Sequence, residues 1–328
     1  MRVLTRKDVE SLLDLDQLID ALADAMADVS SGSASLPPRV AAFVPDVDGM
    51  QAAMPGYVPA IGILETKLVT VFPHNEQRGL PSHQAVIVAF EPETGTPQAL
   101  MDGTYITAVR TAAASALSTR LLARAEASVM AIVGTGVQAR AHAEAIPRVR
   151  SITEVRIAGR NPEKAARLAE EIAAEANGTV RAVPSAREAV QGADIVCATT
   201  HSSSPVIDRQ WLSPGVHITS VGVNKEGPEI DAATVADAVV VVESRAAALA
   251  PFPAGAADLS FPIRDGVITP EHVHAELGDL VTGARPGRTS DDQITLYKSV
   301  GIAAEDAAAA ALVLRAAEKK GAGTEVTL

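Results

Sequence analysis

The feature that most constrains the fold is a glycine-rich turn between an apolar run and a helix-forming segment. The apolar residues Ala131-Ile-Val lead into Gly134-Thr-Gly-Val-Gln-Ala139. In a Gly-x-Gly-x-x-Ala pattern the first glycine permits a tight turn, the second lets the backbone approach a pyrophosphate, and the small third residue allows close packing of helix on strand. The N-terminus of the following helix attracts phosphate through its N–H groups and its dipole. The pattern therefore predicts a dinucleotide site made by Gly134, Thr135, Gly136, Val137, Gln138 and Ala139.

The sequence around this turn alternates short β-branched runs with helical stretches between about residues 128 and 243. This alternation predicts an α/β fold with a doubly wound parallel sheet of Rossmann type. Asn161 and Pro162 are typical of a helix N-cap and first helical position. Ligands bind beyond the carboxyl ends of strands in such sheets, so we also expect Thr199 and Val221 to contact the cofactor. The predicted strands are 129–133, 154–158, 179–183, 195–199, 217–221 and 238–242.

The length of 328 residues exceeds the size at which a single core usually keeps growing, so we expect two domains. The first part of the chain reads as a split α+β domain, with helices over 14–26 and 107–123 and strands over 62–71 and 83–90. The helical tail has no predicted strand to accompany it in the sheet domain, so we expect it to return to the first domain. The expected division is 1–120, 121–300 and 301–328.

The charge and cysteine content exclude several classes of function. The formal net charge of −12 argues against nucleic acid or an anionic membrane as a partner, because both require clustered Lys and Arg. No apolar stretch approaches the roughly 20 residues that span a bilayer, and no signal peptide is evident, so we expect a cytoplasmic protein. The single cysteine, Cys197, excludes a thiolate zinc cluster, and no His/Cys spacing suggests another metal site.

The end of the second predicted strand bears on which dinucleotide binds. An Asp or Glu there binds the adenosine ribose, whereas an Arg accommodates a 2′-phosphate. The sequence Ala158-Gly-Arg-Asn161 has no carboxylate at this point. We therefore expect Arg160 and Asn161 to contact the cofactor, and we expect NADP(H) to be preferred, with NAD(H) as the alternative.

Further motifs extend over nearly the whole chain. They are Pro37-Pro-Arg39, Met54-Pro-Gly56, Lys67, Gly79-Leu-Pro-Ser82, Asp102-Gly-x-x-Ile-Thr-Ala-Val-Arg-Thr-Ala-Ala-Ala-Ser115 and Gly287-Arg-Thr-Ser-Asp-Asp-Gln-Ile-Thr-Leu-Tyr-Lys-Ser-Val-Gly301. Together with the glycine-rich turn, these motifs resemble the ornithine cyclodeaminase/mu-crystallin family, which includes an archaeal-type alanine dehydrogenase and ketimine reductases. The resemblance implies a first domain that binds the substrate and forms a homodimer, a Rossmann domain, and a C-terminal helix that returns to the first domain.

The resemblance also implies that Arg39, Arg110 and Lys67 hold the substrate carboxylate. Bidentate contacts from arginine fix the orientation of a carboxylate, and hence of the neighbouring α-carbon, towards a nicotinamide. We expect like charge from the arginines to lower the pKa of Lys67, which would suit it to exchange a proton with an amine or imine nitrogen.

Asn224 is a departure from the family pattern, because cyclodeaminases and the alanine dehydrogenase carry an aspartate there. An asparagine can orient groups at a catalytic site but cannot exchange a proton at neutral pH. Cyclodeamination requires several proton transfers, so this change disfavours it. Gln51 lies near a family glutamate that receives the distal amine of ornithine, and its neutral side chain disfavours a diamine substrate.

The expected function is therefore an NAD(P)-dependent oxidoreductase that transfers hydride between nicotinamide C4 and the α-carbon of a small imino or amino acid. Lys67 and Asn224 are the expected catalytic residues, and Arg39 and Arg110 are expected to clamp the carboxylate. Two alternatives stay open. One is an ornithine cyclodeaminase, which releases ammonia, and the other is a non-catalytic protein that binds a dinucleotide and a small ligand.

Overall fold

The computed structural model describes residues 1–327, and for Glu76 it describes the backbone alone. The chain divides into two compact units. The first unit contains residues 1–110 and the segment from Gly301 onward, and the second contains Thr111–Val300. The division falls inside helix α3 (Gly103–Leu122), as does the expected boundary at residue 120. The two units are described in turn.

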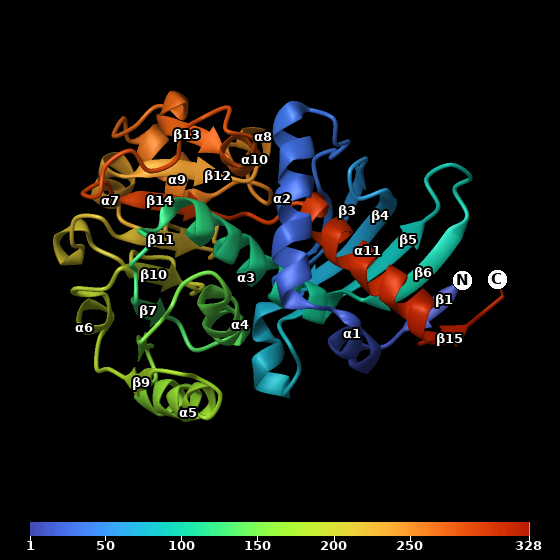
Figure 1. The fold of residues 1–328 in the computed structure, drawn as a ribbon, viewed down its shortest axis with the longest axis horizontal. Helices are drawn as coiled ribbons and strands as arrows, with labels where there is room; N and C mark the ends of the chain where they lie inside the picture. Colours follow the sequence, from blue (N-terminus) through green and yellow to red (C-terminus); the bar gives the residue numbers. More distant parts are fainter. Residues whose placement is uncertain (328) are drawn as a thin grey trace. The chain divides into compact units, whose positions relative to one another are not determined.

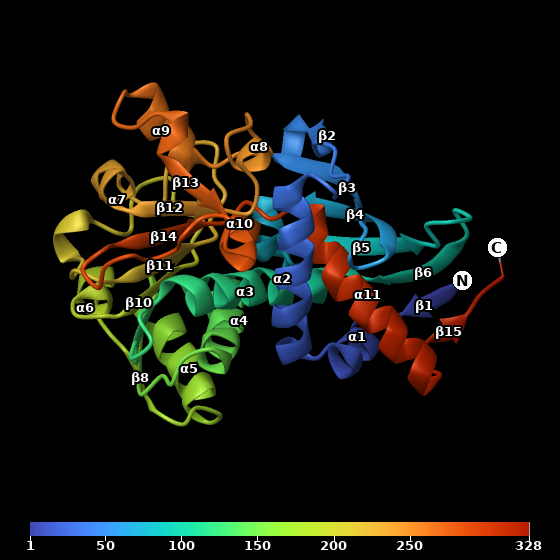
Figure 2. The same cartoon turned by 45° about the horizontal axis from the view of Figure 1, so that its top comes forward.

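The first unit is built on a seven-stranded sheet with the order β15-β1-β6-β5-β4-β3-β2 (Figure 2). Its neighbouring strands are antiparallel except β1 and β6, which are parallel. The expected strands over 62–71 and 83–90 correspond to β4 and β5. The strands are β1 (Arg2–Leu4), β2 (Val40–Val44), β3 (Gly49–Val58), β4 (Ile63–Val71), β5 (His83–Phe90), β6 (Pro97–Asp102) and β15 (Thr324–Glu325).

One face of this sheet is covered by helix α11 (Ala303–Lys320), which packs on β3, β4 and β5 and against helix α2 (Figure 1). Helix α2 (Leu15–Ser31) begins after the N-cap Asp14 and ends at Gly32, whose positive φ of 77° suits glycine. It is therefore longer than the predicted helix over 14–26. The other helical elements are α1 (Arg6–Leu12), η1 (Pro45–Val47) and η2 (Pro73–Arg78).

The opposite face of the sheet carries apolar side chains that stay accessible. Side chains alternate between the two faces of a strand, so Leu68 and Val86 point away from the face that carries buried Lys67 and Ile87. Leu68 is 37% exposed and Val86 is 41% exposed. The edge strand β2 adds Val40, which pairs with Ala53 opposite Leu68 and is 67% exposed. Accessible apolar groups on a sheet face and an edge strand are typical of a surface that another chain covers.

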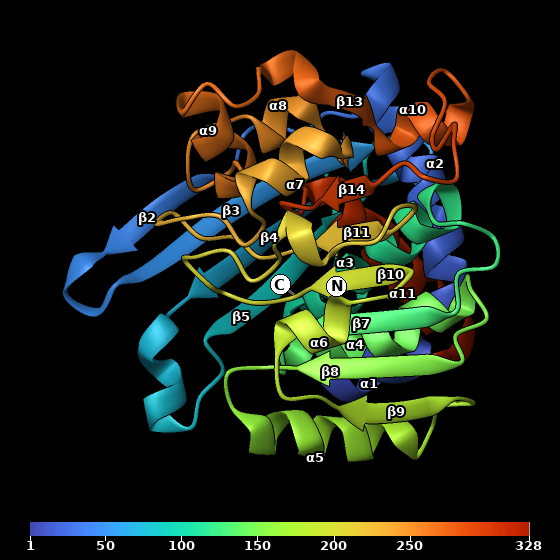
Figure 3. The same cartoon turned by 90° about the vertical axis from the view of Figure 1, so that its left-hand side faces the viewer.

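The second unit contains an eight-stranded parallel sheet with the order β13-β12-β14-β11-β10-β7-β8-β9 (Figure 3). From β7 the chain runs outward to β9 and then returns to β10 on the other side of β7, which makes the sheet doubly wound. The predicted fold class is confirmed. The strands are β7 (Val129–Val133), β8 (Glu154–Ala158), β9 (Thr179–Ala182), β10 (Ile195–Ala198), β11 (His217–Ser220), β12 (Val239–Val242), β13 (Val273–Glu276) and β14 (Thr295–Lys298).

Every predicted strand of this unit is present, and the ends differ by at most one residue. The sequence analysis missed β13 and β14, and β14 lies between β11 and β12 in the sheet. The sequence of β14, Thr-Leu-Tyr-Lys, is short and ends on a charged residue, so its full burial cannot be inferred from its composition. The helical elements are α4 (Val137–Ala145), η3 (Ile146–Arg148), α5 (Pro162–Ala173), α6 (Ala186–Val190), η4 (Arg209–Trp211), α7 (Ala232–Asp237), α8 (Arg245–Ala248), α9 (Ala257–Arg264), η5 (Pro270–His272) and α10 (Leu277–Thr282).

None of the helices within residues 1–327 is both long enough and apolar enough to cross a membrane. Within the same residues, no group of three or more His, Cys, Asp or Glu side chains is arranged to hold a metal ion.

Two buried histidines stabilise the second unit in their neutral form. His142 on α4 has Nδ1 at 2.7 Å from the carbonyl oxygen of Gln138 and Nε2 at 2.8 Å from the hydroxyl oxygen of Ser115. Burial lowers the pKa of His142 to about 4, and burial lowers the pKa of His217 to about 3. Because the folded chain disfavours protonation of these rings, their contribution to stability is complete above the ordinary histidine pKa and is lost as the pH falls below it.

We expect the second unit to lose stability as the pH falls from about 6.5 towards 4. The variant His142→Gln should lose about 2 kcal/mol less than the unmutated protein in free energy of unfolding between pH 7 and pH 5. Trp211 is the only tryptophan and lies in the second unit, so its fluorescence during urea unfolding measures this change. The exposed His201 supplies a matched control, His201→Gln, which should keep the pH dependence. An unchanged pH dependence in His142→Gln would contradict the prediction.

Candidate active site

Buried charged side chains gather in the first unit where α11 begins. Lys67 on β4 lies with Nζ 2.6 Å from Oδ2 of Asp306 on α11. The other oxygen of Asp306, Oδ1, accepts a hydrogen bond from Nε of Arg110 at 3.0 Å. Arg110 also pairs with Glu305 through Nη1. Lys67, Arg110, Glu305 and Asp306 are all buried, so these ion pairs are shielded from solvent.

Arg39 reaches the same place through the backbone of Gly301. Its Nη2 donates a hydrogen bond of 2.5 Å to the carbonyl oxygen of Gly301. Gly301 has a φ of 70°, and a Cβ built on it would lie 2.7 Å from Nη1 of Arg110. Only glycine fits this point without strain, because a side chain would displace the guanidinium. The structure thus brings the expected substrate-binding residues Arg39, Lys67 and Arg110 together around Gly301 and Asp306.

We use the name Lys67 cluster for Arg39, Glu65, Lys67, Arg110, Glu305 and Asp306. The sequence analysis missed its three acidic members. Glu305 and Asp306 stand in the first turn of a helix, where acidic residues are common because they favour the helix dipole. Nothing in the local sequence distinguishes that ordinary role from ion pairs with residues that are distant in the chain. Glu65 lies in β4, which was predicted as a strand from its β-branched and apolar residues, and nothing in that pattern indicates a role for a glutamate.

Lys67 has a proton that is poised for exchange near neutral pH. Burial lowers the pKa of Lys67 to about 8, the neighbouring carboxylate of Asp306 opposes this change, and the positive charge of Arg110 adds to it. The expected direction is therefore right and the like charge of Arg110 contributes to it, but loss of solvation, which the sequence analysis did not foresee, has the larger effect. A buried amine with a pKa near the working pH is suited to general acid–base chemistry.

In the second unit, the turn after β7 has the geometry that a pyrophosphate requires. Gly134 has a φ of 132°, and a Cβ there would lie 2.3 Å from Oγ1 of Thr199. A Cβ on Gly136 would meet no protein atom within 4 Å, so the space beside it is open. Gly136 is the N-cap of α4 and supplies no side-chain hydrogen bond to the helix. The open space and the uncapped helix N-terminus fit a phosphate group.

The other residues of the expected turn pack around this space. Thr135 lies against Gly159, where a Cβ would be 2.5 Å from Cγ2 of Thr135. Ala139 is fully buried, as helix–strand packing requires, and Val137 is 71% exposed at the start of the helix. Gln138 contributes its carbonyl oxygen to the contact with His142.

The residues at the strand ends have different environments. Arg160 is exposed after β8. Asn161 caps α5, because its Oδ1 accepts a hydrogen bond of 3.0 Å from the backbone N–H of Lys164. Thr199 donates from its hydroxyl to the carbonyl oxygen of Val133 at 3.1 Å. The backbone N–H of Val221 donates to the carbonyl oxygen of Ala198 at 3.1 Å, which continues the pairing of β11 with β10.

Asn224 lies in the loop after β11 and belongs to the second unit, whereas Lys67 belongs to the first. Its Nδ2 donates a hydrogen bond of 3.1 Å to the carbonyl oxygen of His201, and its Oδ1 accepts one of 2.8 Å from the N–H of Glu226. The amide therefore connects the loops that follow β10 and β11. The bond from Nδ2 makes this connection, whereas the bond to Oδ1 lies within the loop after β11.

A buried lysine fixes the same edge of the sheet. Nζ of Lys298, the last residue of β14, lies 2.8 Å from Oδ2 of Asp258 and donates to Oγ of Ser220 at 3.0 Å and to the carbonyl oxygen of Gly222 at 2.5 Å. Glu229 accepts hydrogen bonds from the hydroxyl of Ser220 and the N–H of Gly222. Lys298 thus has a structural role in holding the loop after β11.

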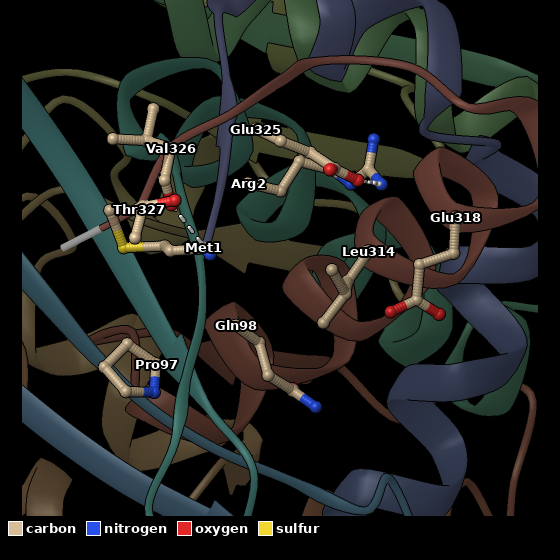
Figure 4. Close-up of a pocket in the computed structure, with 9 residues that line it drawn as sticks. All are labelled: Met1, Arg2, Pro97, Gln98, Leu314, Glu318, Glu325, Val326 and Thr327. Carbon is tan, nitrogen blue, oxygen red and sulfur yellow. Dashed lines mark hydrogen bonds and ion pairs between the residues drawn. The ribbon is translucent and has the colours of Figure 1, made fainter.

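A pocket of about 330 Å³ occurs elsewhere in the first unit, between the two termini, β6 and α11 (Figure 4). Arg2, the basic side chain of its lining, forms an ion pair with Glu325, in which Nη2 of Arg2 lies 3.0 Å from Oε1 of Glu325. The pocket contains none of the expected site residues. Its lining residues are Met1, Arg2, Pro97, Gln98, Leu314, Glu318, Glu325, Val326 and Thr327.

Known proteins are similar to this chain over nearly its whole length. The model of the ornithine cyclodeaminase/mu-crystallin family matches residues 1–321. The structure of Thermococcus litoralis Δ1-pyrroline-2-carboxylate reductase in complex with NADH and L-proline is 38% identical, with a TM-score of 0.95 over 99% of this chain and 100% of that chain.

Two further relatives carry the names of different enzymes. The structure of an archaeal alanine dehydrogenase dimer with bound NAD is 32% identical, with a TM-score of 0.92 over 100% of this chain and 99% of that chain. Mouse ketimine reductase mu-crystallin is 37% identical over 300 residues, which are 90% of each chain. With the family model matched over nearly its whole length and these relatives aligned over both units, the chain belongs to the ornithine cyclodeaminase/mu-crystallin family.

Proposed function

We propose that the protein is an NAD(P)-dependent reductase of a small cyclic ketimine or α-imino acid, and that in reverse it oxidises the corresponding amino acid. The observation that carries this proposal is Lys67, which is buried with Arg110 and Asp306 and has its pKa lowered by burial to about 8. The Thermococcus litoralis reductase, whose structure contains NADH and L-proline, supports the substrate class.

The proposed role of the arginines is to bind the substrate carboxylate. Arg39, Lys67 and Arg110 bring three cations to the Lys67 cluster, whereas Glu305 and Asp306 bring two carboxylates. Among these five side chains one positive charge is left in excess, which suits an anionic substrate. Arg39 is half-buried, so it is the member that a ligand reaches from solvent. Binding through the carboxylate fixes the orientation of the α-carbon.

The proposed role of Lys67 is to donate a proton to the imine nitrogen during reduction and to accept it during oxidation. A bound nicotinamide dinucleotide supplies the hydride to the α-carbon or removes it. Gly134, Gly136 and the N-terminus of α4 would hold its pyrophosphate. The other residues proposed to contact the cofactor are those of the same turn and of the adjacent strand ends, namely Thr135, Val137, Gln138, Ala139, Thr199 and Val221. Asp306 keeps the ammonium of Lys67 in place through its ion pair.

Cyclodeamination of ornithine is the alternative within the family, and the environment of Asn224 disfavours it. Both groups of its amide hydrogen-bond to the backbone, so the proposed role of Asn224 is to orient loops rather than to move protons. Gln51 on β3 is exposed and neutral. It therefore offers no charge to a distal ammonium. A non-catalytic binding protein would have no use for the lowered pKa of Lys67.

Turnover assays separate these functions. With NADH or NADPH and pyrroline-2-carboxylate or piperideine-2-carboxylate, we expect stoichiometric loss of reduced cofactor, followed by its absorbance. Ornithine with catalytic NAD⁺ should release little ammonia. Lys67→Ala should lower kcat by about 10²- to 10⁴-fold, the usual contribution of general acid–base catalysis, and Asn224→Ala should lower it far less. Dinucleotide binding by Lys67→Ala is the control for folding. Rapid formation of ammonia and proline from ornithine would show that the cyclodeaminase alternative is right.

The exposed Arg160 makes NADP(H) the proposed preferred cofactor, with NAD(H) possible. We expect titrations followed by the fluorescence of Trp211 to give tighter binding of NADPH than of NADH, because a 2′-phosphate pairs with a guanidinium. Arg160→Ala should remove most of that difference. Arg167, exposed on α5, supplies the matched control Arg167→Ala, which should keep it. Equal affinities for the two cofactors in the unmutated protein would remove the basis of this assignment.

We also propose that the protein is a homodimer in which the accessible apolar face of the first unit is covered by a second copy. The archaeal alanine dehydrogenase is described as a dimer. Leu68, Val86 and Val40 supply the apolar surface for such a contact. Burial of a contiguous apolar patch is a principal source of stability in a permanent dimer.

Light scattering tests this arrangement. At micromolar concentration we expect a mass about twice the 33.8 kDa of one chain. Leu68→Glu should shift the protein towards the monomer, because it places a charge in the apolar contact. Val267 is a comparably exposed apolar residue of the second unit, and Val267→Glu should leave the mass unchanged. A monomeric unmutated protein would contradict the dimer, and a dimeric Leu68→Glu variant would place the interface elsewhere.

A further inference from the structure

Glu65 is a buried carboxyl group without a hydrogen-bond partner. Its relative exposure is 0%, and neither carboxyl oxygen has a partner among residues 1–327. Glu65 and Lys67 are two residues apart on β4, so both side chains lie on the face of the sheet that α11 covers. Gly56 lies opposite Glu65 on β3, and a Cβ on it would be 3.4 Å from Oε1 of Glu65.

The charges that act on Glu65 come from three elements. Lys67 lies on the same strand, Asp306 on α11 and Arg110 on α3. The neighbouring strands place no charged residue opposite Glu65, because β3 presents Gly56 and β5 presents Ala89. Asp306 itself forms ion pairs with Lys67 and Arg110. Glu65 thus faces one carboxylate and two cations that already have an anionic partner.

The two carboxyl groups respond to this environment in opposite directions. Burial raises the pKa of Glu65 well above its usual range, and the negative charge of Asp306 adds to the increase. Burial acts in the same sense on Asp306, but Arg110 and Lys67 outweigh it and hold the pKa of Asp306 below its usual value. A buried carboxylate without hydrogen bonds is costly, so the proton is retained on the group that lacks donors.

We propose that Glu65 is a positioning residue that stays uncharged, so that the Lys67 cluster keeps one net positive charge for a substrate carboxylate. This inference rests on the proposed function and assigns a role to a residue that the reaction does not otherwise use. The excess charge exists only while Glu65 is neutral, because its ionisation would balance the three cations with three carboxylates.

Ionisation of Glu65 has two separable effects on the site. It weakens the attraction of the cluster for a substrate carboxylate, which raises KM. It also raises the pKa of Lys67, because a further negative charge favours the ammonium form. The second effect makes Lys67 a weaker acid. A neutral Glu65 therefore supports both substrate binding and proton donation.

Infrared spectroscopy of the unliganded protein tests the protonation directly. We expect the carbonyl stretch of a protonated carboxylic acid in the unmutated protein at neutral pH and its loss in Glu65→Gln, which replaces the acid by a neutral group of the same shape. Glu65→Ala provides the same comparison if Glu65→Gln does not fold. Absence of the band from the unmutated protein, or its persistence in both variants, would overturn the proposal, whatever the protein catalyses.

Steady-state kinetics with pyrroline-2-carboxylate tests the consequence. Above the pH at which the infrared band disappears, the KM of the unmutated protein should rise by about tenfold more than that of Glu65→Gln, because deprotonation of Lys67 affects both proteins whereas the new carboxylate charge arises only in the unmutated one. An equal alkaline rise in both would overturn the role of Glu65 in binding.

Calorimetric titration with L-proline repeats the comparison without turnover. Over the same alkaline range the unmutated protein should lose more affinity for L-proline than Glu65→Gln loses. If imines are not reduced but the infrared band and the binding difference are found, the proposed function fails and the assignment of Glu65 stands. If imines are reduced but the infrared band is missing, the proposed function stands and the assignment of Glu65 fails.

Discussion

The carboxylate of Asp306 is the interaction on which the first unit depends. One oxygen pairs with Lys67 on β4 and the other with Arg110 on α3, so a single side chain joins a strand, the helix α3 and the helix α11. All three charges are buried, and removing one partner from such a group typically costs about 3–5 kcal/mol because the remaining charges are left uncompensated. Together with the packing of α11 on α2, β3, β4 and β5, this interaction holds the C-terminal segment in the unit formed by the N-terminal part of the chain.

The second unit uses a similar device at the carboxyl ends of its strands. Lys298 extends from the last position of β14 and is satisfied by Asp258, Ser220 and the carbonyl oxygen of Gly222. A fully hydrogen-bonded network in a dry interior is rigid, because any displacement leaves a polar group without a partner. Its position holds the backbone that follows β11. The first residues of the loop after β11 are therefore held in place.

The sequence predicted the parts of this structure that local patterns encode. The glycine-rich turn, the alternation of strands and helices and the cap at Asn161 all depend on neighbouring residues, and all are present. The strand β14 could not be predicted, because its four residues end in Lys298, whose burial depends on Asp258 and other partners that are distant in the sequence. Glu65 and Asp306 were missed for the same reason. Their burial and their partners come from tertiary contacts.

The lowered pKa of Lys67 also depends on tertiary structure that the sequence does not reveal. Neighbouring arginines can be inferred from motifs, but the extent of burial cannot, and burial has the larger effect. In the proposed function the two units recognise different ligands. The charges that suit a carboxylate belong to the first unit, whereas the turn that suits a pyrophosphate and the exposed Arg160 belong to the second. On that proposal a change of substrate requires changes in the first unit alone, and relatives that keep the fold do carry the names of different reductases and dehydrogenases.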